Sequence, residues 1–218
     1  MDRVSRRFGS GQGAVSALHK VSLGVSSGEV VALTGRSGSG KTTLLRLIAG
    51  LDRVNSGEIF VGDEAVHQLS SSGRERLRRQ RVSLVFQEYN LVPELTASEN
   101  VRLALHLAGV RGVPQRTAAQ EALSRLGLEG LGERRPARLS GGEQQRVAIA
   151  RALAVGTEVI LADEPTGSLD AENAAVVMDC LHQAAADGAA VLVATHDPEV
   201  VSRATRGLAI TRGALNQA

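Results

Sequence analysis

Hydrophobic residues in this chain fall into short, nearly continuous runs that are separated by turn residues. Such runs cover residues 17–25, 30–34, 82–86, 159–162 and 189–194. Most of them lack the apolar–polar alternation of a half-exposed strand. This pattern favours strands that are covered on both faces, as in a parallel sheet.

Helical patterns fill much of the sequence between these runs. Helices are expected over residues 42–49, 96–108, 114–127 and 171–186. Boundary signals support them, among them a Thr-x-x-Glu capping box at the start of the second helix and a glycine after the first. The segment 70–81 is arginine-rich and mostly polar, so we expect a solvated helix or a loop there.

The order of these elements predicts an α/β fold with a three-layer core and a mainly parallel sheet, because strand–helix alternation flanks a purely helical stretch. Residues 58–66, with Gly62 and Asp63 at the centre, have the pattern of a hairpin. We expect one domain over residues 1–218. Its core with a small antiparallel β-lobe spans 1–86 and 156–218, and its inserted all-helical lobe spans 87–155.

Composition narrows the classes of partner. The net charge is only +2 and aromatic residues make up 2 %, so neither a basic field nor a base-stacking platform predicts nucleic-acid binding. The single cysteine, Cys180, is expected to pack in a helix. No apolar run reaches the roughly 20 residues of a membrane-spanning helix, and no signal sequence is evident. At a membrane, we expect another chain to supply the membrane part.

A glycine-rich loop gives the strongest chemical signal. It lies between an apolar run and a predicted helix and consists of Gly35, Arg36, Ser37, Gly38, Ser39, Gly40, Lys41, Thr42 and Thr43. The spacing G-x-x-x-x-G-K-[ST] lets backbone N–H groups converge on phosphate oxygens at a helix N-terminus. Lys41 is expected to reach the β- and γ-phosphates of ATP, and Thr42 to bind Mg²⁺. The core is therefore predicted to be of the P-loop NTPase type.

Two adjacent carboxylates end the apolar run at 159–162. Alone, such a pair is equally typical of a strand that leads into a capped helix. Beside a phosphate-binding loop, Asp163 is expected to hold Mg²⁺ and Glu164 to orient or deprotonate the attacking water.

Residues 139–146, Leu-Ser-Gly-Gly-Glu-Gln-Gln-Arg, allow two interpretations. Ser140 and Glu143 form a capping box for the following helix. The same geometry makes Ser140, Gly141 and Gly142 an anion site at a helix N-terminus. Taken alone the capping interpretation is favoured, but together with the phosphate-binding loop we favour the anion site.

These motifs, with Gln87, Ser168-Leu169-Asp170 and His196, occur in the order and spacing of an ABC transporter ATPase, which the chain resembles over nearly its whole length. The resemblance implies ATP and Mg²⁺ as cofactors and a head-to-tail dimer that forms on ATP binding. In that dimer, ATP lies between the phosphate-binding loop of one chain and residues 140–143 of the other. It further implies that Gln87 contacts Mg²⁺ and signals, that Asp170 communicates between sites, and that His196 contacts the γ-phosphate and positions Glu164.

Single residues in this set also have structural interpretations. Gln87 could be a surface residue after a strand, and His196 could cap a helix that begins near Pro198. Phe8 matches the place of an aromatic ring that stacks on adenine in this family, or else belongs to a small β-lobe core. Two departures from the family are expected to affect the β-lobe edge: Met1 stands near the end of the first strand, and residues 205–208 lack the usual charge pattern.

The function expected from the resemblance is ATP hydrolysis that powers a membrane transporter from the cytoplasmic face of the membrane. Residues 87–109 look like those of lipoprotein-release and macrolide-export ATPases, which work with an integral membrane permease. The alternative is a soluble, non-transport ABC ATPase, whose zinc hooks, long coiled coils or paired cassettes are not evident in this sequence. The apolar cluster of Leu91, Val92, Pro93 and Leu95 either packs inside the helical lobe or lines a groove for a permease helix.

Overall fold

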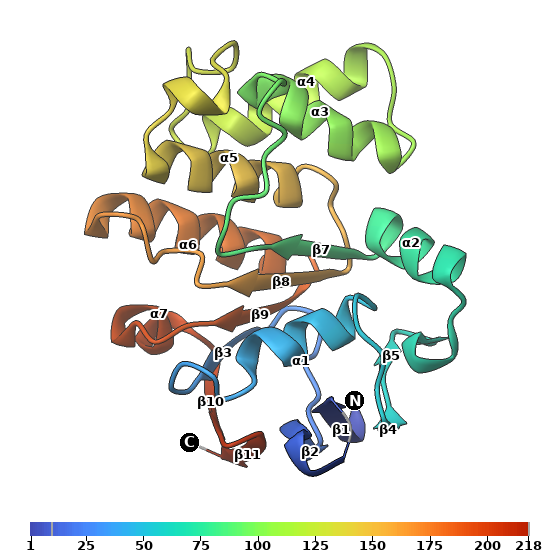
Figure 1. Cartoon of the computed structure of the whole chain (residues 1–218). Helices are drawn as coiled ribbons and strands as arrows, with labels where there is room; N and C mark the ends of the chain where they lie inside the picture. The colour runs from blue at the N-terminus through green and yellow to red at the C-terminus, as the bar shows by residue number, and fades with distance from the viewer. Residues whose placement is uncertain (10, 218) are drawn as a thin grey trace.

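A six-stranded sheet forms the centre of the computed structural model, which describes residues 1–9 and 11–217 (Figure 1). The strand order is β11-β10-β3-β9-β8-β7. The strands are β3 (Val30–Thr34), β7 (Val82–Val85), β8 (Val159–Asp163), β9 (Ala190–Ala194), β10 (Arg206–Thr211) and β11 (Ala214–Gln217). All neighbours pair in parallel except β11, which is antiparallel to β10.

Alternate residues of each central strand enter two different hydrophobic cores, which is why the strands read as continuous apolar runs. Val191 and Val193 of β9 pack in the core that includes α6 (Ala171–Ala186). Leu192, between them, packs in the core on the other face, with α1 (Lys41–Ile48). The two helical layers with the sheet between them confirm the predicted three-layer α/β fold.

The β-lobe lies beneath the sheet in the view of Figure 1 and is a second, antiparallel sheet of order β2-β1-β4. Its strands are β1 (Asp2–Phe8), β2 (Val15–Val21) and β4 (Ser56–Glu58). The prediction that Met1 stands near the end of the first strand is wrong, because β1 has seven residues and pairs on both edges. The second strand ends four residues before the predicted boundary at 25.

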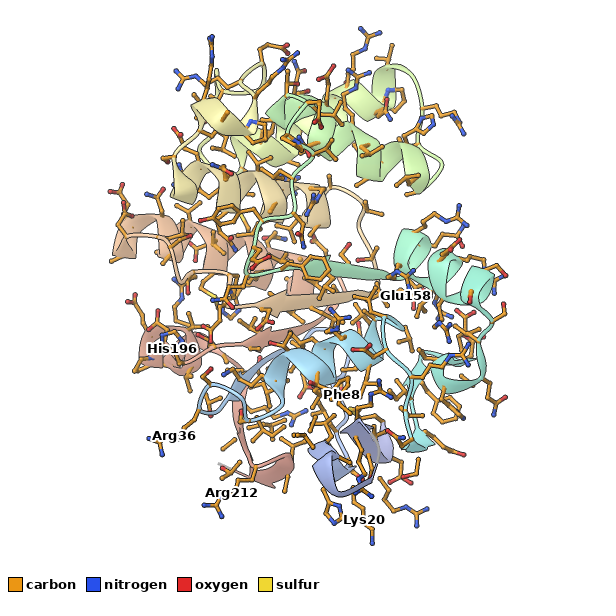
Figure 2. All side chains as sticks on the ribbon, in the orientation of Figure 1. Phe8, Lys20, Arg36, Glu158, His196 and Arg212 are labelled. Carbon is orange, nitrogen blue, oxygen red and sulfur yellow. The ribbon has the colours of Figure 1, made fainter. Side chains whose placement is uncertain are left out.

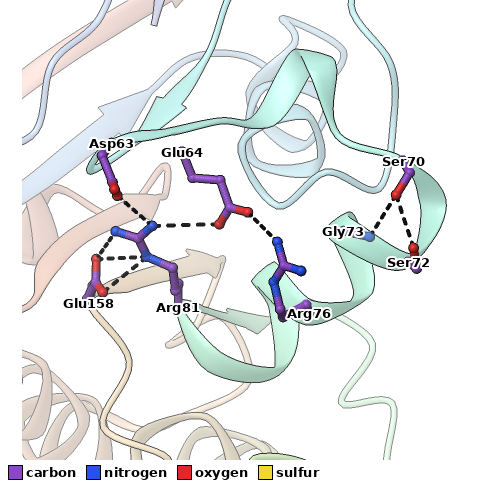
Figure 3. A network of polar contacts seen from close by, with 8 residues as sticks. All are labelled: Asp63, Glu64, Ser70, Ser72, Gly73, Arg76, Arg81 and Glu158. Atoms are coloured by element: carbon purple, nitrogen blue, oxygen red, sulfur yellow. Dashed lines mark hydrogen bonds and ion pairs between the residues drawn. The ribbon is translucent and has the colours of Figure 1, made fainter.

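The predicted hairpin is present as β5 (Phe60–Val61) and β6 (Glu64–Ala65), and the polar segment after it is the helix α2 (Ser71–Gln80). Ion pairs of Arg81 connect the hairpin to the segment that leads into β8 of the central sheet (Figure 3). Its guanidinium forms ion pairs with Asp63 at 2.9 Å, Glu64 at 3.6 Å and Glu158 at 2.9 Å. These acids come from the hairpin and from the residue before β8, so one side chain joins three segments.

The helical lobe consists of α3 (Ala97–Leu107), α4 (Val113–Ser124) and α5 (Gly141–Leu153), with no strand among them. Both predicted capping boxes are formed, at Thr96 and at Ser140. The second helix of the lobe ends at Ser124, three residues before the predicted glycine. Short 3₁₀ turns lie at Gly11–Gly13, Val66–Gln68 and Pro136–Arg138, and α7 (Pro198–Arg203) is the last helix.

Strands β10 and β11 were not predicted from the sequence. Arg206–Thr211 forms β10 beside β3, so the unusual charge pattern after Ala204 belongs to the central sheet rather than to the β-lobe edge. Among the described residues, no helix combines the length and apolar character that a membrane crossing requires.

Candidate functional site

A cleft of about 860 Å³ opens at the edge of the sheet where the parallel strands end. In open parallel sheets this edge is where ligands bind. The cleft is lined by the whole glycine-rich loop and by residues from the β-lobe, the strand ends and α5. These others are Val15, Ser16, Ala17, Gln87, Tyr89, Gln145, Asp163, Glu164, Gly167, Ser168 and His196.

The glycine-rich loop requires two of its glycines, Gly35 and Gly40, for steric reasons. A Cβ at Gly35 would lie 2.5 Å from Ile210 O, and one at Gly40 would lie 2.6 Å from Ala17 O. Gly40 also has φ +112° and is the N-cap of α1 without any side-chain cap. The first N–H groups of α1 are therefore left for a ligand in the cleft, as phosphate binding requires.

Lys41 and Thr42, the first two residues of α1, face the carboxylates at the end of β8. Lys41 Nζ donates a 2.7 Å hydrogen bond to Gly35 O and lies 3.9 Å from Glu164 Oε1. The Thr42 hydroxyl donates to Asp163 Oδ2 at 2.7 Å. Burial raises the pKa of Asp163 above its ordinary value, and the hydrogen bond from Thr42 opposes that rise.

Glu164 is held in an uncommon backbone conformation, with φ +49°. Its N–H donates to Ala194 O at 2.8 Å, which fixes it against the end of β9. Its Oε2 lies 2.9 Å from His196 Nδ1. A non-glycine residue in this region costs on the order of 1–3 kcal/mol, and such strain gathers at functional sites.

The residues near Thr42 fit a Mg²⁺ ion. The Thr42 hydroxyl, the Asp163 carboxylate and the Gln87 carboxamide all offer hard oxygen donors at one cleft, and Mg²⁺ takes such ligands together with phosphate oxygens. Gln87 lies two residues after β7 and is exposed. The sequence predicted these three residues as magnesium ligands, and the structure brings all three to the same cleft.

The predicted anion site of residues 140–142 lies outside the cleft. Ser140 and Gly141 are exposed at the start of α5, and Ser140 Oγ accepts a hydrogen bond from Glu143 N at 3.2 Å. The carboxylate of Glu143 accepts from Ser140 N at 2.6 Å, completing the capping box. Figure 1 shows the start of α5 on the side toward which the central strands point, the side that also carries the glycine-rich loop.

Asp170 caps α6 and does not line the cleft. Its Oδ1 accepts from Asn173 N at 2.8 Å, and the hydrogen bonds from Asn173 hold the pKa of Asp170 below its ordinary value. Phe8 is 40 % exposed and pairs with Val15, a cleft residue, while the Arg6 guanidinium covers its ring at 4.4 Å. Figure 2 labels Phe8 in the β-lobe, and it shows Arg36 and His196 on the left side of the molecule.

Several cleft residues were missed from the sequence, namely Val15, Ser16, Ala17, Tyr89, Gln145 and Gly167. Tyr89 is two positions after Gln87, a spacing that could have drawn attention to it. Gln145 lies one turn beyond Gly141 on α5, in a helix whose inner face reads as ordinary core.

Comparison with known proteins decides the family. The sequence profile described as "ABC transporter" matches residues 18–167. The chain belongs to the ABC transporter family. Membership confirms the fold and the ATPase activity with ATP and Mg²⁺ that the motifs predicted. The matched range includes the glycine-rich loop and the Asp163-Glu164 pair, whereas Ser168 and His196 of the cleft lie beyond it.

Within the family, the chain is similar to macrolide export proteins. The chain is 45 % identical over 213 residues to the macrolide export ATP-binding/permease protein MacB of Burkholderia pseudomallei (strain 1710b), and 44 % identical over 210 residues to MacB of Escherichia coli (strain K12). These matches cover 98 % and 96 % of the chain but only 33 % and 32 % of the relatives. The chain thus spans about a third of their length.

Solved structures of an ATP-binding cassette, MJ0796, match the whole fold. A dimeric post-hydrolysis state bound to ADP and Pi has a TM-score of 0.93 at 37 % identity, covering 99 % of this chain and 97 % of that one. A second dimeric structure, described as a bacterial ABC transporter cassette, has the same TM-score at 38 % identity and covers 99 % and 95 %.

Proposed function

We propose that this ABC ATPase works as one half of a head-to-tail pair and powers an exporter or a lipoprotein- or peptide-release system at the cytoplasmic face of a membrane. The observation that carries the catalytic part is the Glu164 carboxylate, which lies at the mouth of the cleft between Lys41 and His196. Only 12 % of that side chain is exposed, because Lys41 and His196 lie on either side of it. The Glu164 carboxylate is therefore held toward the place of the nucleotide in this proposal.

Each polar group in the cleft has a role in this proposal. Glu164 orients or deprotonates the attacking water, and His196 holds that carboxylate through Nδ1 and contacts the γ-phosphate. Lys41 leaves Gly35 O to reach the β- and γ-phosphates. Thr42, Asp163 and Gln87 would hold Mg²⁺, whose positive charge would offset the negative charge that develops during phosphoryl transfer.

Pairing explains why the start of α5 stands apart from the cleft. Ser140 and Gly141 are exposed and Gly142 is half-buried, and no nucleotide in the same chain's cleft uses the N–H groups of Gly141 and Gly142 in this proposal. Because both surfaces lie on one side of the molecule, a second chain turned head to tail brings its residues 140–143 over the first chain's nucleotide. The dimeric states of MJ0796 support this arrangement.

In the paired state, Phe8 stacks on the adenine from the cleft rim, and Asp170 communicates between the sites through the start of α6. The Arg6 guanidinium over the Phe8 ring leaves one face of that ring for a base.

The partner is proposed to be an integral membrane permease, as the likeness to MacB over about a third of its length supports. The loop after Gln87 offers a contact surface. Leu91 packs against the helical-lobe core, as the structural interpretation predicted, whereas Pro93 and Glu94 are exposed. The exposed part of this loop, with half-buried Val92, is proposed to receive a cytoplasmic helix of the permease.

The variant Glu164→Gln tests the catalytic assignment. It keeps the size and hydrogen bonds of the side chain but removes its basicity, so ATP binding should persist while hydrolysis falls by ~10²-fold or more. The trapped ATP state should elute as a dimer in size-exclusion chromatography. A control, Glu133→Gln on the exposed surface of the helical lobe, should hydrolyse ATP normally. Near-normal turnover by Glu164→Gln would remove this residue from its proposed role.

A further inference from the structure

Arg6 of β1 lies two positions before Phe8, and its side chain covers that residue's ring. The guanidinium carbon of Arg6 is 4.4 Å from the centroid of the Phe8 ring. This is a cation–π contact, which arginine forms readily with the faces of aromatic rings. Because Phe8 is 40 % exposed, the guanidinium decides which face of the ring is left open.

The backbone of β1 is irregular at Arg6. Its pairing with β2 shifts register between Val4 and Arg6, and again between Arg6 and Arg7. Irregularities of this kind re-aim side chains and are common beside active sites. Arg6 is half-buried, whereas Arg7, the next residue, is exposed. The strand therefore places one of two adjacent arginines against the Phe8 ring and leaves the other at the surface.

The positive charge of Arg6 has no acidic partner in the described parts of the chain. None of the ion pairs within residues 1–9 and 11–217 includes this side chain. Its Nε is buried and has no hydrogen-bond partner among the same residues. Within them, the Phe8 ring is the partner that the structure gives this cation.

Phe8 lies on the side of the β-lobe that faces the nucleotide cleft. It pairs directly with Val15 of β2, which lines the cleft, and side chains directly opposite in an antiparallel pair share one face. Further along β2, Ala17 O lies 2.6 Å from the position of a Cβ on Gly40, so the strand touches the phosphate-binding loop there. Val15 is two residues away, about 7 Å at the rise of a strand. This spacing suits a ribose between the phosphates and a base at Phe8.

We propose that Arg6 is a positioning residue for the nucleotide base and acts through Phe8. With the guanidinium over one face, the ring offers only its other face to the adenine, and its orientation is restricted before the nucleotide arrives. The cation also draws π-electron density toward itself, so the open face becomes less negative and better suited to an electron-rich purine. This inference rests on the stacking of Phe8 in the proposed function.

The test compares Mg-ADP with Mg-pyrophosphate, which carries the same number of phosphates but no base. Isothermal titration calorimetry measures both affinities. Arg6→Met keeps a long side chain and removes the charge. Its Kd for Mg-ADP should rise about 3- to 10-fold, whereas its Kd for Mg-pyrophosphate should stay within about two-fold of the wild-type value. Arg6→Lys keeps a cation near the ring and should recover part of the loss.

Steady-state kinetics and a matched control show where Arg6 acts. For Arg6→Met, the KM for ATP should rise by a similar factor while kcat stays within about two-fold, because the base is affected and the phosphates are not. The control is Arg7→Met, which removes the same charge from the neighbouring exposed residue. That variant should bind Mg-ADP and Mg-pyrophosphate as the wild type does.

A double-mutant cycle with Phe8→Leu tests whether Arg6 acts through the ring. Phe8→Leu should weaken the binding of Mg-ADP but not of Mg-pyrophosphate, since only the stacking surface is lost. In the Phe8→Leu chain, Arg6→Met should add less than about a two-fold loss, because the ring on which Arg6 acts is gone.

The outcomes separate this inference from the proposed function. If Phe8→Leu binds Mg-ADP as tightly as the wild type, the stacking in the proposed function is wrong and this inference falls with it. If Phe8→Leu weakens Mg-ADP but Arg6→Met does not, stacking stands and the role of Arg6 is overturned. Equal losses for Mg-ADP and Mg-pyrophosphate in Arg6→Met would also overturn it, because they indicate a general attraction between charges. If Arg6→Met does not fold, Arg6→Gln decides in the same measurements.

Discussion

The Thr42 hydroxyl donates a 2.7 Å hydrogen bond to Asp163 Oδ2, which joins the first turn of α1 to the end of β8. The contact sets the two side chains that are proposed to bind Mg²⁺ next to each other. Asp163 is 7 % exposed, and this burial raises its pKa. The ionised form of this carboxylate is therefore less favourable in the folded chain than in the unfolded chain.

Asp163→Asn should separate stability from activity. The variant keeps an oxygen that accepts from Thr42 but removes the buried charge, so the melting temperature in EDTA at pH 7 should rise. Mg²⁺-dependent hydrolysis should fall on the order of 10²-fold because a metal ligand is lost. Differential scanning fluorimetry and phosphate release measure the two effects. An Asp163→Asn protein that melts at a lower temperature than the wild type in EDTA would contradict the argument that the buried Asp163 carboxylate destabilises the fold.

The same variant gives a pH dependence with a defined sign. Since the pKa of Asp163 is raised in the folded state, folding favours its neutral form. Below the ordinary pKa of aspartate the carboxyl is neutral in both states, and the advantage of Asp163→Asn should vanish. As pH rises through the ordinary value toward the raised folded pKa, the advantage should grow and then level off. Urea unfolding in EDTA at several pH values checks this trend.

Ser140→Arg tests the composite site. The substitution fills the exposed start of α5 but leaves the chain's own glycine-rich loop untouched, so Mg-ATP should bind the monomer with nearly unchanged affinity. Hydrolysis should collapse because the paired site cannot close. Mixing this protein with Lys41→Ala should restore at most one working site per dimer. Ser72→Arg, at the exposed start of α2, is the control that should retain activity.

The Arg81 network in Figure 3 should contribute to stability rather than to chemistry. Arg81→Ala leaves Glu64 with Arg76 as its remaining arginine partner. The variant should lower the free energy of unfolding by about 1–2 kcal/mol. Asp63→Ala should cost much less than Arg81→Ala, because the Asp63 side chain is 93 % exposed and its ion pair is screened by solvent. Urea denaturation gives both values. Equal losses in the two variants would show that exposure does not rank these pairs.

Crosslinking tests the proposed permease contact. Single cysteines at Val92 and Glu94, in a chain whose half-buried Cys180 is replaced by alanine, should crosslink to the cytoplasmic loops of the permease. The yield should change with nucleotide state, because the loop begins at Gln87. A cysteine at Arg76 on α2 serves as the control that should not react. An intact complex that gives no crosslink from 92 or 94 in any nucleotide state would place the contact on another surface.

The local motifs could be predicted from the sequence. The glycine-rich loop, the Asp163-Glu164 pair and the capping boxes at Thr96 and Ser140 each depend on residues within a few positions of one another, so their spacing was enough to predict them. The positions of the central strands could also be predicted, for a related reason. A strand covered on both faces has to be apolar along its whole length, and this leaves a continuous run in the sequence.

Long-range relationships were decided only by the tertiary structure. Strand order, the placement of β10 beside β3 and the seven-residue β1 depend on pairing between distant segments, which local periodicity does not encode. The approach of Tyr89 to Gly141 joins residues that are far apart in the chain, and nothing in either neighbourhood indicates it. The sequence by itself predicted which groups bind nucleotide, because the backbone geometry near a motif is local. Packing of the helical lobe on the core decided which of those groups share a cleft and which lie outside it, at the exposed start of α5.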